Sequence, residues 1–477
     1  MTETASVRVG PETWRVAEFV RDARWEDLPA DVRAQSVRCV LDLLGSAVAG
    51  SRTKVERLIA EHARVAYGVG TMTIIGAGFR STPVGAVLAN GFAANALDLD
   101  DGYRPLKGHP SAAVVPAALS AAQHVGASGA EFLTAVAVGL EVAMRAGAVL
   151  HRLYDFYHGT GSWGPIGAAA GAAHLLASDT EMIWHALGVA EFHAPMTPEM
   201  RSVDHPSMLK DGIGWGAMTG LASAQLAARG FTAIPSLFDA QEAGSALVES
   251  LGREYLMRDL YFKPYACCRW AQPAVKGALL ATAGLGVKSA EIARVLVHTF
   301  EAATHLLCTS PRTTEEAQFS LPWSVACALT RDAVGPEEVL EGGLEDPELR
   351  ALASRVDIVR DPQLDSLFPD QALARVEIET SDERRCVSEI VSAPGDAGNA
   401  PSDDELADKF KKLATPVLGP EQATELLSCI RELPEEANLS SLLRWLLPKE
   451  HDCEQATNDA PCQTSPCATE PRHHSEI

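Results

Sequence analysis

The chain has 477 residues, more than one hydrophobic core usually serves, so we expect two or three domains. Hydrophobic residues make up 47% of the chain and charged residues 22%, a globular balance that excludes a largely disordered or fibrous protein. Forty Lys and Arg against 63 Asp and Glu give a net charge of −23, which argues against nucleic acid and anionic membrane surfaces as partners.

The apolar runs are too short to span a bilayer. The longest, such as Ala112–Ala122 and Gly164–Ala177, fall short of the roughly 20 residues that a spanning helix needs. The N-terminus is polar and acidic, without the apolar core of a signal peptide. We therefore expect a soluble, cytoplasmic protein without a membrane partner.

The cysteine pattern does not predict a metal centre. Ten cysteines are spread along the chain, and none has the Cys-x-x-Cys spacing. Cys267 and Cys268 are adjacent and cannot easily chelate one ion, while Cys453, Cys462 and Cys467 lack a matching histidine. We expect reduced thiols, no metal and no other cofactor.

Residues 1–265 predict a large all-helical domain. Around Val37, apolar side chains recur with helical spacing up to Gly50, which we expect to cap the helix in the left-handed conformation. Gly167–Ala173 and Gly216–Ala228 are rich in Ala and Gly, which lets helices approach closely. We expect further helices at Val84–Leu97, Ala112–Val125, Ala130–Val149, Ile166–Ala177, Glu181–Phe192 and Trp215–Ala228.

Residues 266–398 predict a smaller α+β lid domain. Alternation with period two in Ile292–Phe300 predicts a strand. Two more such runs, Ala374–Glu379 and Val387–Ser392, flank the polar turn Ser381–Arg384 and form a candidate hairpin. Helical patterns alternate with these strands, at Ala271–Ala283, Pro322–Ala333 and Pro347–Val356.

The C-terminal residues divide into two segments. Residues 399–447 return to helical spacing, with Leu406, Phe410 and Leu413 as the first repeat, and we expect them to pack back on the helical domain. Residues 448–477 are polar, and we expect disorder there. The predicted fold class is mainly α, a large helical domain with a smaller α+β lid.

Motifs for common cofactors and nucleophiles are absent from the sequence. The chain has no Gly-rich loop followed by Lys-Ser/Thr, no HExxH and no G-x-S-x-G, and Gly68-Val69-Gly70 is too short for a dinucleotide fingerprint. The sequence therefore does not support an enzyme that uses NAD, ATP or a hydrolase serine. What remains are polar clusters in apolar, small-residue surroundings.

The first two clusters contain histidines. Asp98, Asp100 and Asp101 repel one another at the end of an apolar helix and need a compensating partner, for which His109 is a candidate. His158 precedes an Ala/Gly-rich helix whose free N–H groups are typical of an anion site. The alternatives are a solvated acidic turn and a flexible glycine turn with a surface histidine.

The other two clusters are cationic. Lys210 precedes a small-residue helix, and Lys263 and Arg269 lie at the junction between the predicted domains. A solitary lysine is usually solvated on the surface. Each of these is bracketed by apolar residues, however, and domain junctions are preferred ligand sites.

Together, the order and spacing of these clusters resemble the MmgE/PrpD family, which contains 2-methylcitrate dehydratases, cis-aconitate decarboxylases and an iminodisuccinate epimerase. The resemblance runs from the helix around Val37 to about residue 445. It implies a helical domain with an α+β lid, usually a homodimer, and a cofactor-free site between the domains. The matching segments are Asp98–Asp101 with His109-Pro110-Ser111, His158–Gly161, Lys210, Lys263–Cys268 and Pro311–Ser320.

Three positions depart from the family pattern. Gly102 stands where the family commonly has Thr or Ser, so one hydroxyl contact is missing. Trp323 stands where a Tyr is frequent, and an indole cannot act as a phenol acid. Gln272 replaces a common His. These departures bear on the substrate and the reaction.

The resemblance implies removal of a proton α to a carboxylate, followed by loss of water, loss of CO2 or reprotonation. We expect His109 or His158 to move the proton. The histidine would be oriented by Asp98 or Asp101. Substrate carboxylates would be clamped by Lys210 and Lys263 with help from Arg269, and the other expected binding residues are Gly102, Tyr265 and Trp323.

The leading hypothesis is a hydro-lyase, a dehydratase that acts on a citrate-like hydroxy polycarboxylate. Decarboxylation would use the same residues and break a different bond. The loss of a phenol acid at Trp323 gives some support to an epimerase or isomerase. A non-catalytic carboxylate-binding dimer, with the histidines as satisfied core residues, is the alternative from another class.

Overall fold

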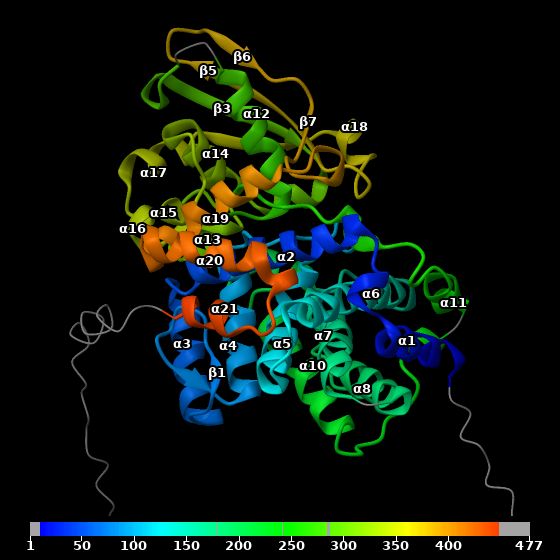
Figure 1. The fold of residues 1–477 in the computed structure, drawn as a ribbon. Coiled ribbons are helices and arrows are strands. Elements are labelled where there is room, and N and C mark those ends of the chain that lie inside the picture. The colour runs from blue at the N-terminus through cyan, green and yellow to red at the C-terminus, as the bar shows by residue number, and fades with distance from the viewer. Residues whose placement is uncertain (1–9, 178, 241, 284–286, 448–477) are drawn as a thin grey trace, which may run out of the picture.

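A computed structural model describes residues 10–177, 179–240, 242–283 and 287–447. The protein is mostly helical, with a sheet in its C-terminal part (Figure 1). The disorder expected for residues 448–477 lies outside the described residues.

The helical part is built around α7, which contacts α5, α6, α8 and α10. Every residue of α7 from Thr160 to Ala173 is buried. Small side chains permit this, because a Cβ at Gly167 would lie 2.3 Å from Ala143 Cβ on α6. The helices of this part are α1 (Pro11–Asp22), α2 (Ala30–Gly50), α3 (Lys54–His62), α4 (Pro83–Asn95), α5 (Pro110–Val125), α6 (Gly129–Leu153), α7 (Thr160–Leu176), α8 (Thr180–Phe192), α9 (Glu199–Asp204), α10 (Ile213–Ala227) and α11 (Glu242–Glu249).

Gly50 does not have the role that the sequence predicts. It lies inside α2 rather than in a left-handed cap, and Ser51 follows it in right-handed helical conformation. A Cβ at Gly50 would lie 2.0 Å from the carbonyl oxygen of Ala93 on α4. Glycine is needed here because the two helices cross closely, not because the chain reverses.

Helix α6 is the one described helix that is long and apolar enough to cross a membrane by length and composition, and 94% of that stretch is buried inside the protein. It starts with a capping box between Ser128 and Glu131. Farther along, Glu141 and Arg145 form a fully buried ion pair.

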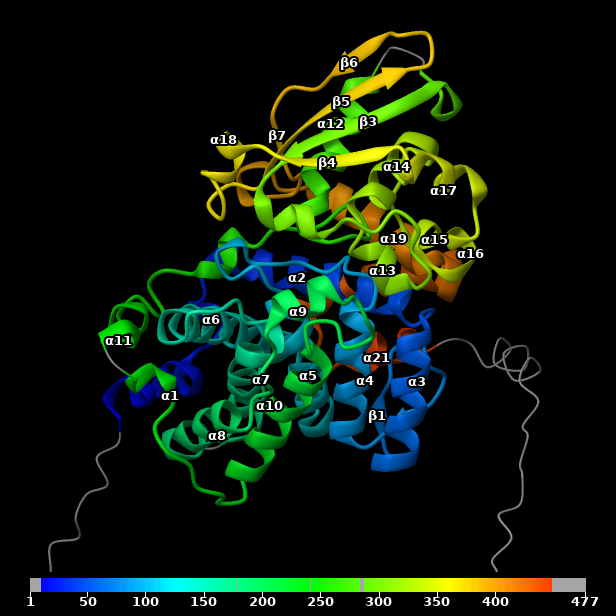
Figure 2. The same ribbon diagram turned by 180° about the vertical axis from the view of Figure 1, so that it is seen from behind.

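The sheet region, residues 266–398, has a sheet with the strand order β4-β3-β5-β6, and β7 pairs with β5. Strand β3 is parallel to β4 and antiparallel to β5. Helix α12 packs on β5, β6 and β7, between the sheet and the helical part (Figures 1 and 2). The short hairpin β1 (Met72–Thr73) and β2 (Arg80–Ser81) lies in the helical part, and the strands of the sheet are β3 (Ile292–Thr299), β4 (Val356–Arg360), β5 (Leu373–Thr380), β6 (Arg385–Val387) and β7 (Val391–Ser392).

The strand predicted over Ile292–Phe300 is confirmed by β3, and the turn predicted at Ser381–Arg384 is confirmed by the pairing of β5 with β6. The run predicted over Val387–Ser392 is not one strand, because β6 ends at Val387 and the separate strand β7 begins at Val391. The helix predicted over Pro347–Val356 ends earlier, and the chain enters β4 at Val356. The helices of the region are α12 (Gln272–Thr282), α13 (Thr314–Gln318), α14 (Leu321–Arg331), α15 (Pro336–Val339), α16 (Glu341–Leu344), α17 (Pro347–Ala353) and α18 (Pro362–Asp365).

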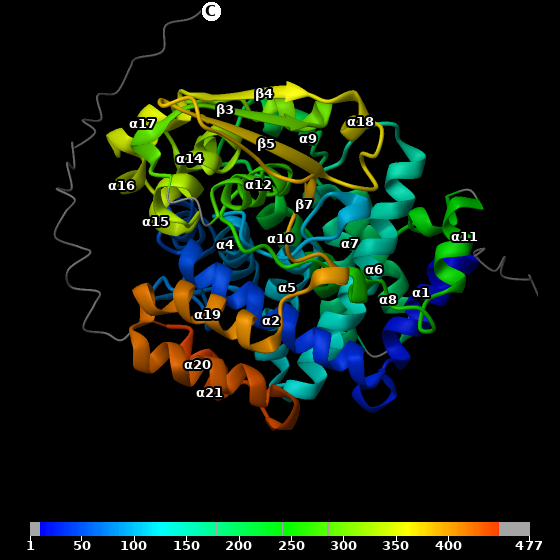
Figure 3. The ribbon, with the colours of Figure 1, turned by 90° about the horizontal axis from the view of Figure 1, so that it is seen from above.

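After the sheet region, the chain returns to the helical part. Helix α19 packs on α2, α20 packs on α19, and α21 follows beside α20 (Figure 3). Leu406 and Phe410 share one core with residues of α2 and α6. The three helices are α19 (Asp403–Leu418), α20 (Pro420–Glu432) and α21 (Ser440–Trp445).

Candidate active site

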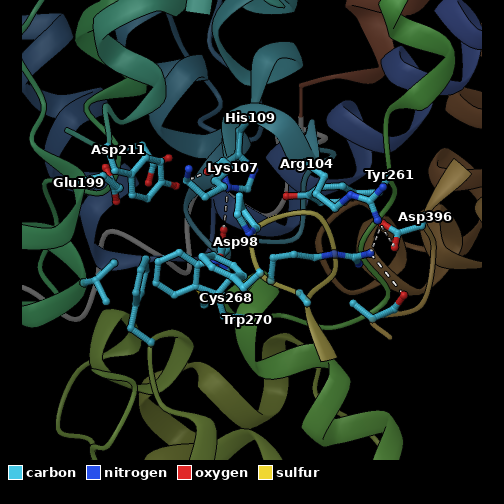
Figure 4. A pocket seen from close by; sticks show the side chains of 18 residues that line it. Asp98, Arg104, Lys107, His109, Glu199, Asp211, Tyr261, Cys268, Trp270 and Asp396 are labelled. Carbon is cyan, nitrogen blue, oxygen red and sulfur yellow. Dashed lines mark hydrogen bonds and ion pairs between the residues drawn. The ribbon is translucent and has the colours of Figure 1, made fainter. Parts of the chain in front are cut away.

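A cavity lies between the helical part and the sheet region (Figure 4), with a free volume of about 50 Å³, or about 700 Å³ when open solvent space is included. Such a concave space with several polar groups is typical of a small-molecule site. Its wall is formed by Asp98, Arg104, Lys107, His109, Tyr157, Glu199, Val203, Asp211, Tyr261, Cys268, Arg269, Trp270, Phe319, Phe368, Pro369, Ala372, Ala393 and Asp396.

Asp98 lies just beyond α4 and points toward two cations. Its Oδ1 is 2.6 Å from Lys263 Nζ and 3.3 Å from His109 Nε2. Burial opposes ionisation of this carboxyl, but Lys263, Lys210 and His109 outweigh it and hold the pKa of Asp98 below its ordinary value. Asp98 is therefore a carboxylate throughout the neutral range.

His109 precedes α5 and is held by two carboxylates. Its Nδ1 lies 2.9 Å from the backbone oxygen of Asp101 and 3.2 Å from Asp100 Oδ2. Burial alone would lower its pKa, but the charge of Asp100, its hydrogen bond and the charge of Asp98 raise the pKa of His109 to about 9. At neutral pH, the side chain is therefore an imidazolium at the cavity wall, able to donate a proton.

Asp100, rather than Asp101, is the second carboxylate on the imidazole. The carboxyl of Asp101 accepts a hydrogen bond from Ser111 Oγ, and burial together with Asp42 raises its pKa to about 7. Asp101 therefore reaches His109 through its backbone oxygen, whereas Asp100 is fixed by Asn95 Nδ2 at 2.9 Å and faces the ring. This corrects the predicted orienting role of the Asp101 side chain.

Asp98, Asp100 and His109 bring three potential metal-ligand atoms within 4.8 Å of one another. The Lys263 ammonium already lies on Asp98, and the raised pKa keeps a proton on His109. Two cations therefore balance the two carboxylates of the cluster. The chemistry of the donor set gives no reason to assign it an ion.

Lys210 and Lys263 lie beside the cavity and are not part of its wall. Lys263 is fully buried against Asp98, and Lys210 Nζ donates to Gln318 Oε1 at 2.6 Å. Gln318 in turn donates from Nε2 to the Ala96 oxygen. The expected clamp on substrate carboxylates is not what this geometry shows, because both ammonium groups are engaged by protein oxygens.

Among the described residues, the permanent cations in the cavity wall are Arg104, Lys107 and Arg269. Arg269 bonds to Asp396 Oδ1 at 2.7 Å, and Arg104 lies 3.5 Å from the other oxygen of that carboxylate. Lys107 Nζ lies 4.7 Å from the centre of the Tyr157 ring, and burial lowers its pKa. Arg269 was predicted from the sequence, but Arg104 and Lys107 were not, although both fall between the acidic cluster and His109.

The opposite wall carries a pair of carboxyls that sequence reasoning missed. Glu199 and Asp211 are both buried, and burial together with the neighbouring Asp211 raises the pKa of Glu199 well above its usual range. Glu199 therefore favours its protonated form beside the Asp211 carboxyl. Thr160 Oγ1 donates to the same aspartate at 3.3 Å.

Backbone strain is concentrated at this site. Asp98, Lys107 and Lys210 have φ values of 53°, 53° and 50°, in the left-handed region that side chains other than glycine avoid. Such strain persists only where the surroundings enforce it, and it is frequent at functional sites. Each of the three turns brings a charged side chain to the cavity or to its immediate border.

His158 lies outside the cavity wall, where its neighbour Tyr157 stands instead. The His158 ring packs 3.8 Å from the Phe156 ring, and burial lowers its pKa to about 4. The predicted anion site at the start of α7 is wrong, because the Gly161 N–H donates to the Asp211 carbonyl oxygen. His158 is thus a neutral, packed histidine.

Three expected binding residues lie elsewhere. Trp323 is fully buried in the core of the sheet region and donates from Nε1 to the Glu338 oxygen. Tyr265 borders a separate groove, between Lys263 and α19. Gly102 borders the cavity through Tyr261, with which it exchanges two backbone hydrogen bonds of 3.0 and 2.9 Å.

Two models of one protein family match most of the chain. The MmgE/PrpD N-terminal domain matches residues 15–257, and the MmgE/PrpD C-terminal domain matches residues 265–434. The chain belongs to the MmgE/PrpD family. This confirms the resemblance seen in the sequence.

Relatives within the family align along nearly their whole length. A cis-aconitate decarboxylase-like protein, oryM, of Aspergillus oryzae is 24% identical over 93% of this chain and 98% of its own. The cis-aconitate decarboxylase of Homo sapiens is 25% identical over 90% and 93%. That of Aspergillus terreus is 22% identical over 91% and 95%. These MmgE/PrpD proteins are enzymes, and each of the three names includes the words cis-aconitate decarboxylase.

Proposed function

We propose that this MmgE/PrpD protein is a lyase that removes CO2 from a small, unsaturated polycarboxylate. The observation that carries the proposal is the His109 imidazolium, held at the cavity wall by Asp98 and Asp100. Decarboxylation breaks a carbon–carbon bond and leaves its electron pair on the substrate. That carbon skeleton must then receive one proton, which is what an imidazolium supplies.

The proposed step balances in atoms and charge. The bond between carbon and the departing carboxylate breaks, CO2 leaves, and the electron pair is taken up by the remaining unsaturated carboxylate. His109 Nε2 gives its proton to carbon and becomes a neutral imidazole, which water reprotonates. The carboxylates Asp98 and Asp100 favour that reprotonation because they stabilise the charged ring.

The charges of the wall support a polyanionic substrate. Arg104, Lys107, Arg269 and the His109 imidazolium present four cations to one cavity, against the carboxyl groups of Asp98, Asp211 and Asp396 and a whole-chain net charge of −23. At a Debye length of about 8–10 Å, the nearby charges outweigh the distant, screened ones. The full-length similarity to cis-aconitate decarboxylases supports the same class of substrate.

Dehydration, the reaction favoured by the sequence analysis, is the second candidate. Loss of water needs one group that takes a proton from carbon and another that gives a proton to the departing hydroxyl. The Glu199–Asp211 pair lies in the same cavity as His109, so the wall offers two proton-transfer groups. This observation keeps a hydroxy polycarboxylate such as 2-methylcitrate among the substrates to be tested.

The experiment is to incubate the purified chain with cis-aconitate, citrate and 2-methylcitrate in heavy water and to follow both NMR spectra and CO2 release. We expect CO2 and new vinyl signals from cis-aconitate. Vinyl signals from a hydroxy acid without CO2 would establish dehydration instead. Solvent exchange without a net product would indicate an isomerase, and no change with any substrate would favour the non-catalytic binding protein.

We also propose that the chain forms a homodimer through α8, α10 and the segments beside them. Exposed apolar side chains gather on these elements, where Phe192, Met196 and Leu209 are 70%, 79% and 71% exposed. Sedimentation velocity should give twice the chain mass. Replacing Phe192 and Leu209 by Ser should shift the protein to monomer, whereas Val69→Ser, which removes a 78% exposed side chain beyond α3, should not.

A further inference from the structure

Two phenols line the cavity, and their hydroxyls differ in what they contact. The Tyr157 hydroxyl donates to the backbone oxygen of Lys107. Tyr261 is 2% exposed, and among the described residues no hydrogen-bond partner is found for its hydroxyl. The hydroxyl of a buried tyrosine normally finds an acceptor, so one that lines a cavity and has no protein acceptor points to a ligand group in that cavity.

The backbone fixes the position of Tyr261. Gly102 N donates to the Tyr261 oxygen at 3.0 Å, and Tyr261 N donates to the Gly102 oxygen at 2.9 Å. These reciprocal bonds form an antiparallel bridge between the segment after Asp101 and the segment before Lys263. The phenol is therefore held against the segment of chain that carries Asp98 and His109.

Glycine at position 102 makes room for this ring. A Cβ there would lie 2.3 Å from Tyr261 Oη and 2.4 Å from its Cζ, well inside any real contact. The φ angle of Gly102 is not in the left-handed region, so backbone conformation gives no reason for a glycine. The reason is steric, since any side chain at 102 would push the phenol away from its place.

The surroundings keep the hydroxyl a hydrogen-bond donor. The Arg269 guanidinium lies 4.1 Å from the centre of the Tyr261 ring. Burial raises the pKa of Tyr261 far above its ordinary value, and the nearby Asp98 adds to the shift. The phenol therefore keeps its proton at neutral pH.

We propose that Tyr261 Oη is a catalytic hydrogen-bond donor to a substrate carboxylate, and that Gly102 is the residue that allows it to stand there. This inference rests on the proposed lyase function. As CO2 leaves, the electron pair spreads onto the remaining conjugated carboxylate, and negative charge grows on its oxygens. A preorganised donor in a buried site stabilises such developing charge without having to reorganise.

The first test is Tyr261→Phe, which removes only the hydroxyl. We expect the kcat of the variant on cis-aconitate to fall by roughly 10- to 100-fold, with a smaller change in KM, because the donor acts mainly on charge that develops during the reaction. Tyr255→Phe is the matched control, since Tyr255 is also a buried tyrosine but lies outside the cavity wall. The control should keep the wild-type kcat.

The second test is a double-mutant cycle. Gly102→Ala should lower kcat by displacing the phenol, and it should cost much less when Tyr261 is already Ala, because the clash is then gone. If the kcat of the double variant is lowered by the product of the two single-variant factors, the assigned role of Gly102 is overturned. Circular dichroism and melting temperature of each variant show that the compared proteins are folded.

A binding measurement separates this inference from the proposed function. Calorimetry with tricarballylate, a saturated tricarboxylate that cannot react, should show binding to the wild type and binding about 3- to 10-fold weaker to Tyr261→Phe. If Tyr261→Phe binds tricarballylate more weakly than the wild type while no substrate reacts, the lyase proposal fails. The proposed hydrogen bond from Tyr261 to a carboxylate is then still supported. If Tyr261→Phe matches the wild type in both turnover and affinity, or if neither is detectable in the wild type, the Tyr261 proposal is overturned.

Discussion

Lys263 Nζ lies 2.6 Å from Asp98 Oδ1, with the lysine fully buried and the aspartate 3% exposed. The lysine comes from the segment that joins the helical part to the sheet region, and the aspartate follows α4. The ion pair therefore links two parts of the chain at the cavity. It also keeps Asp98 ionised next to His109, so that the imidazole retains its proton.

Lys263→Met should destabilise the fold, because it leaves the Asp98 carboxylate buried without its closest cation. Breaking a buried pair in this way costs about 3–5 kcal/mol in the free energy of unfolding. Urea denaturation at pH 7 measures the loss, and adding Asp98→Asn should recover part of it. Lys412→Met, at an exposed lysine of α19, is the control. A variant as stable as the wild type would contradict the structural role of the pair.

The activity should depend on pH through His109. Because its pKa is raised to about 9, the ring is charged at neutral pH and loses its proton as the pH rises through 9. A reaction that uses this proton should therefore slow along that limb in a profile of kcat from pH 6 to pH 10. His109→Gln should reduce kcat by at least about 100-fold, as expected for the loss of a general acid. A wild-type rate that stays constant up to pH 10 would argue against His109 as the donor.

The same group should make stability depend on pH. The pKa of His109 is higher in the folded protein than the ordinary value of about 6.5, so the protonated ring stabilises the fold. This contribution is complete below about pH 6.5 and is lost as the pH rises through 9. The difference in unfolding free energy between the wild type and His109→Gln should therefore shrink between pH 6.5 and pH 9. A difference that stays constant over this interval would mean that the folded protein does not hold the extra proton on the ring.

Gln318 should matter for activity as well as for stability. It accepts a hydrogen bond from Lys210 Nζ and donates one to the Ala96 oxygen, so Gln318→Ala leaves two buried groups without partners. We expect a loss of about 1–3 kcal/mol in unfolding free energy, and a kcat/KM lowered about tenfold because Lys210 is no longer held near Asp98.

Gln422 provides the control for that variant. It is also buried and also makes two hydrogen bonds, to the backbone oxygens of Trp445 and Leu447, far from the cavity. Gln422→Ala should lose a similar amount of stability and keep the wild-type kcat/KM once it is folded. Equal losses of activity in both variants would show that Gln318 acts through stability alone.

Periodicity predicted most of the helices and the β5–β6 hairpin, because each pattern lies within one continuous segment. Strand β4 escaped prediction, since its residues Val356–Arg360 are mostly exposed and its partner β3 lies about 60 residues earlier in the chain. Of the residues that the family resemblance named, Asp98, His109 and Arg269 line the cavity, whereas His158, Lys210 and Lys263 do not. Spacing could not tell that Asp100 rather than Asp101 faces His109, because that depends on a turn in which Asp98 has a positive φ.

Other parts of the site depend on contacts between distant segments. Glu199 enters the cavity because its backbone N–H bonds to the Tyr157 oxygen, and no local motif marks such a position. Lys210 and Lys263 were predicted to clamp substrate carboxylates, but sequence cannot show that protein oxygens already engage them. Arg104 and Lys107 had a usable signal, since both lie within the segment between the acidic cluster and His109.

Asp396 should control how strongly the cavity attracts an anion. Its two oxygens lie 2.7 Å from Arg269 and 3.5 Å from Arg104, so it neutralises part of the charge of two guanidinium groups in the wall. In Asp396→Asn, both keep their charge and face a neutral amide. We expect the KM for cis-aconitate to fall by about 2- to 5-fold, with a steeper dependence on ionic strength, because a half-buried charge at the cavity wall acts mainly on association.

Measurements of KM at several salt concentrations test this expectation. Asp382→Asn is the control, because Asp382 pairs with Arg384 in the hairpin turn, away from the cavity, and its loss should leave KM unchanged. A rise in KM for Asp396→Asn would contradict this expectation. It would show that Asp396 positions Arg269 for the substrate, and that this geometry outweighs the gain in positive charge.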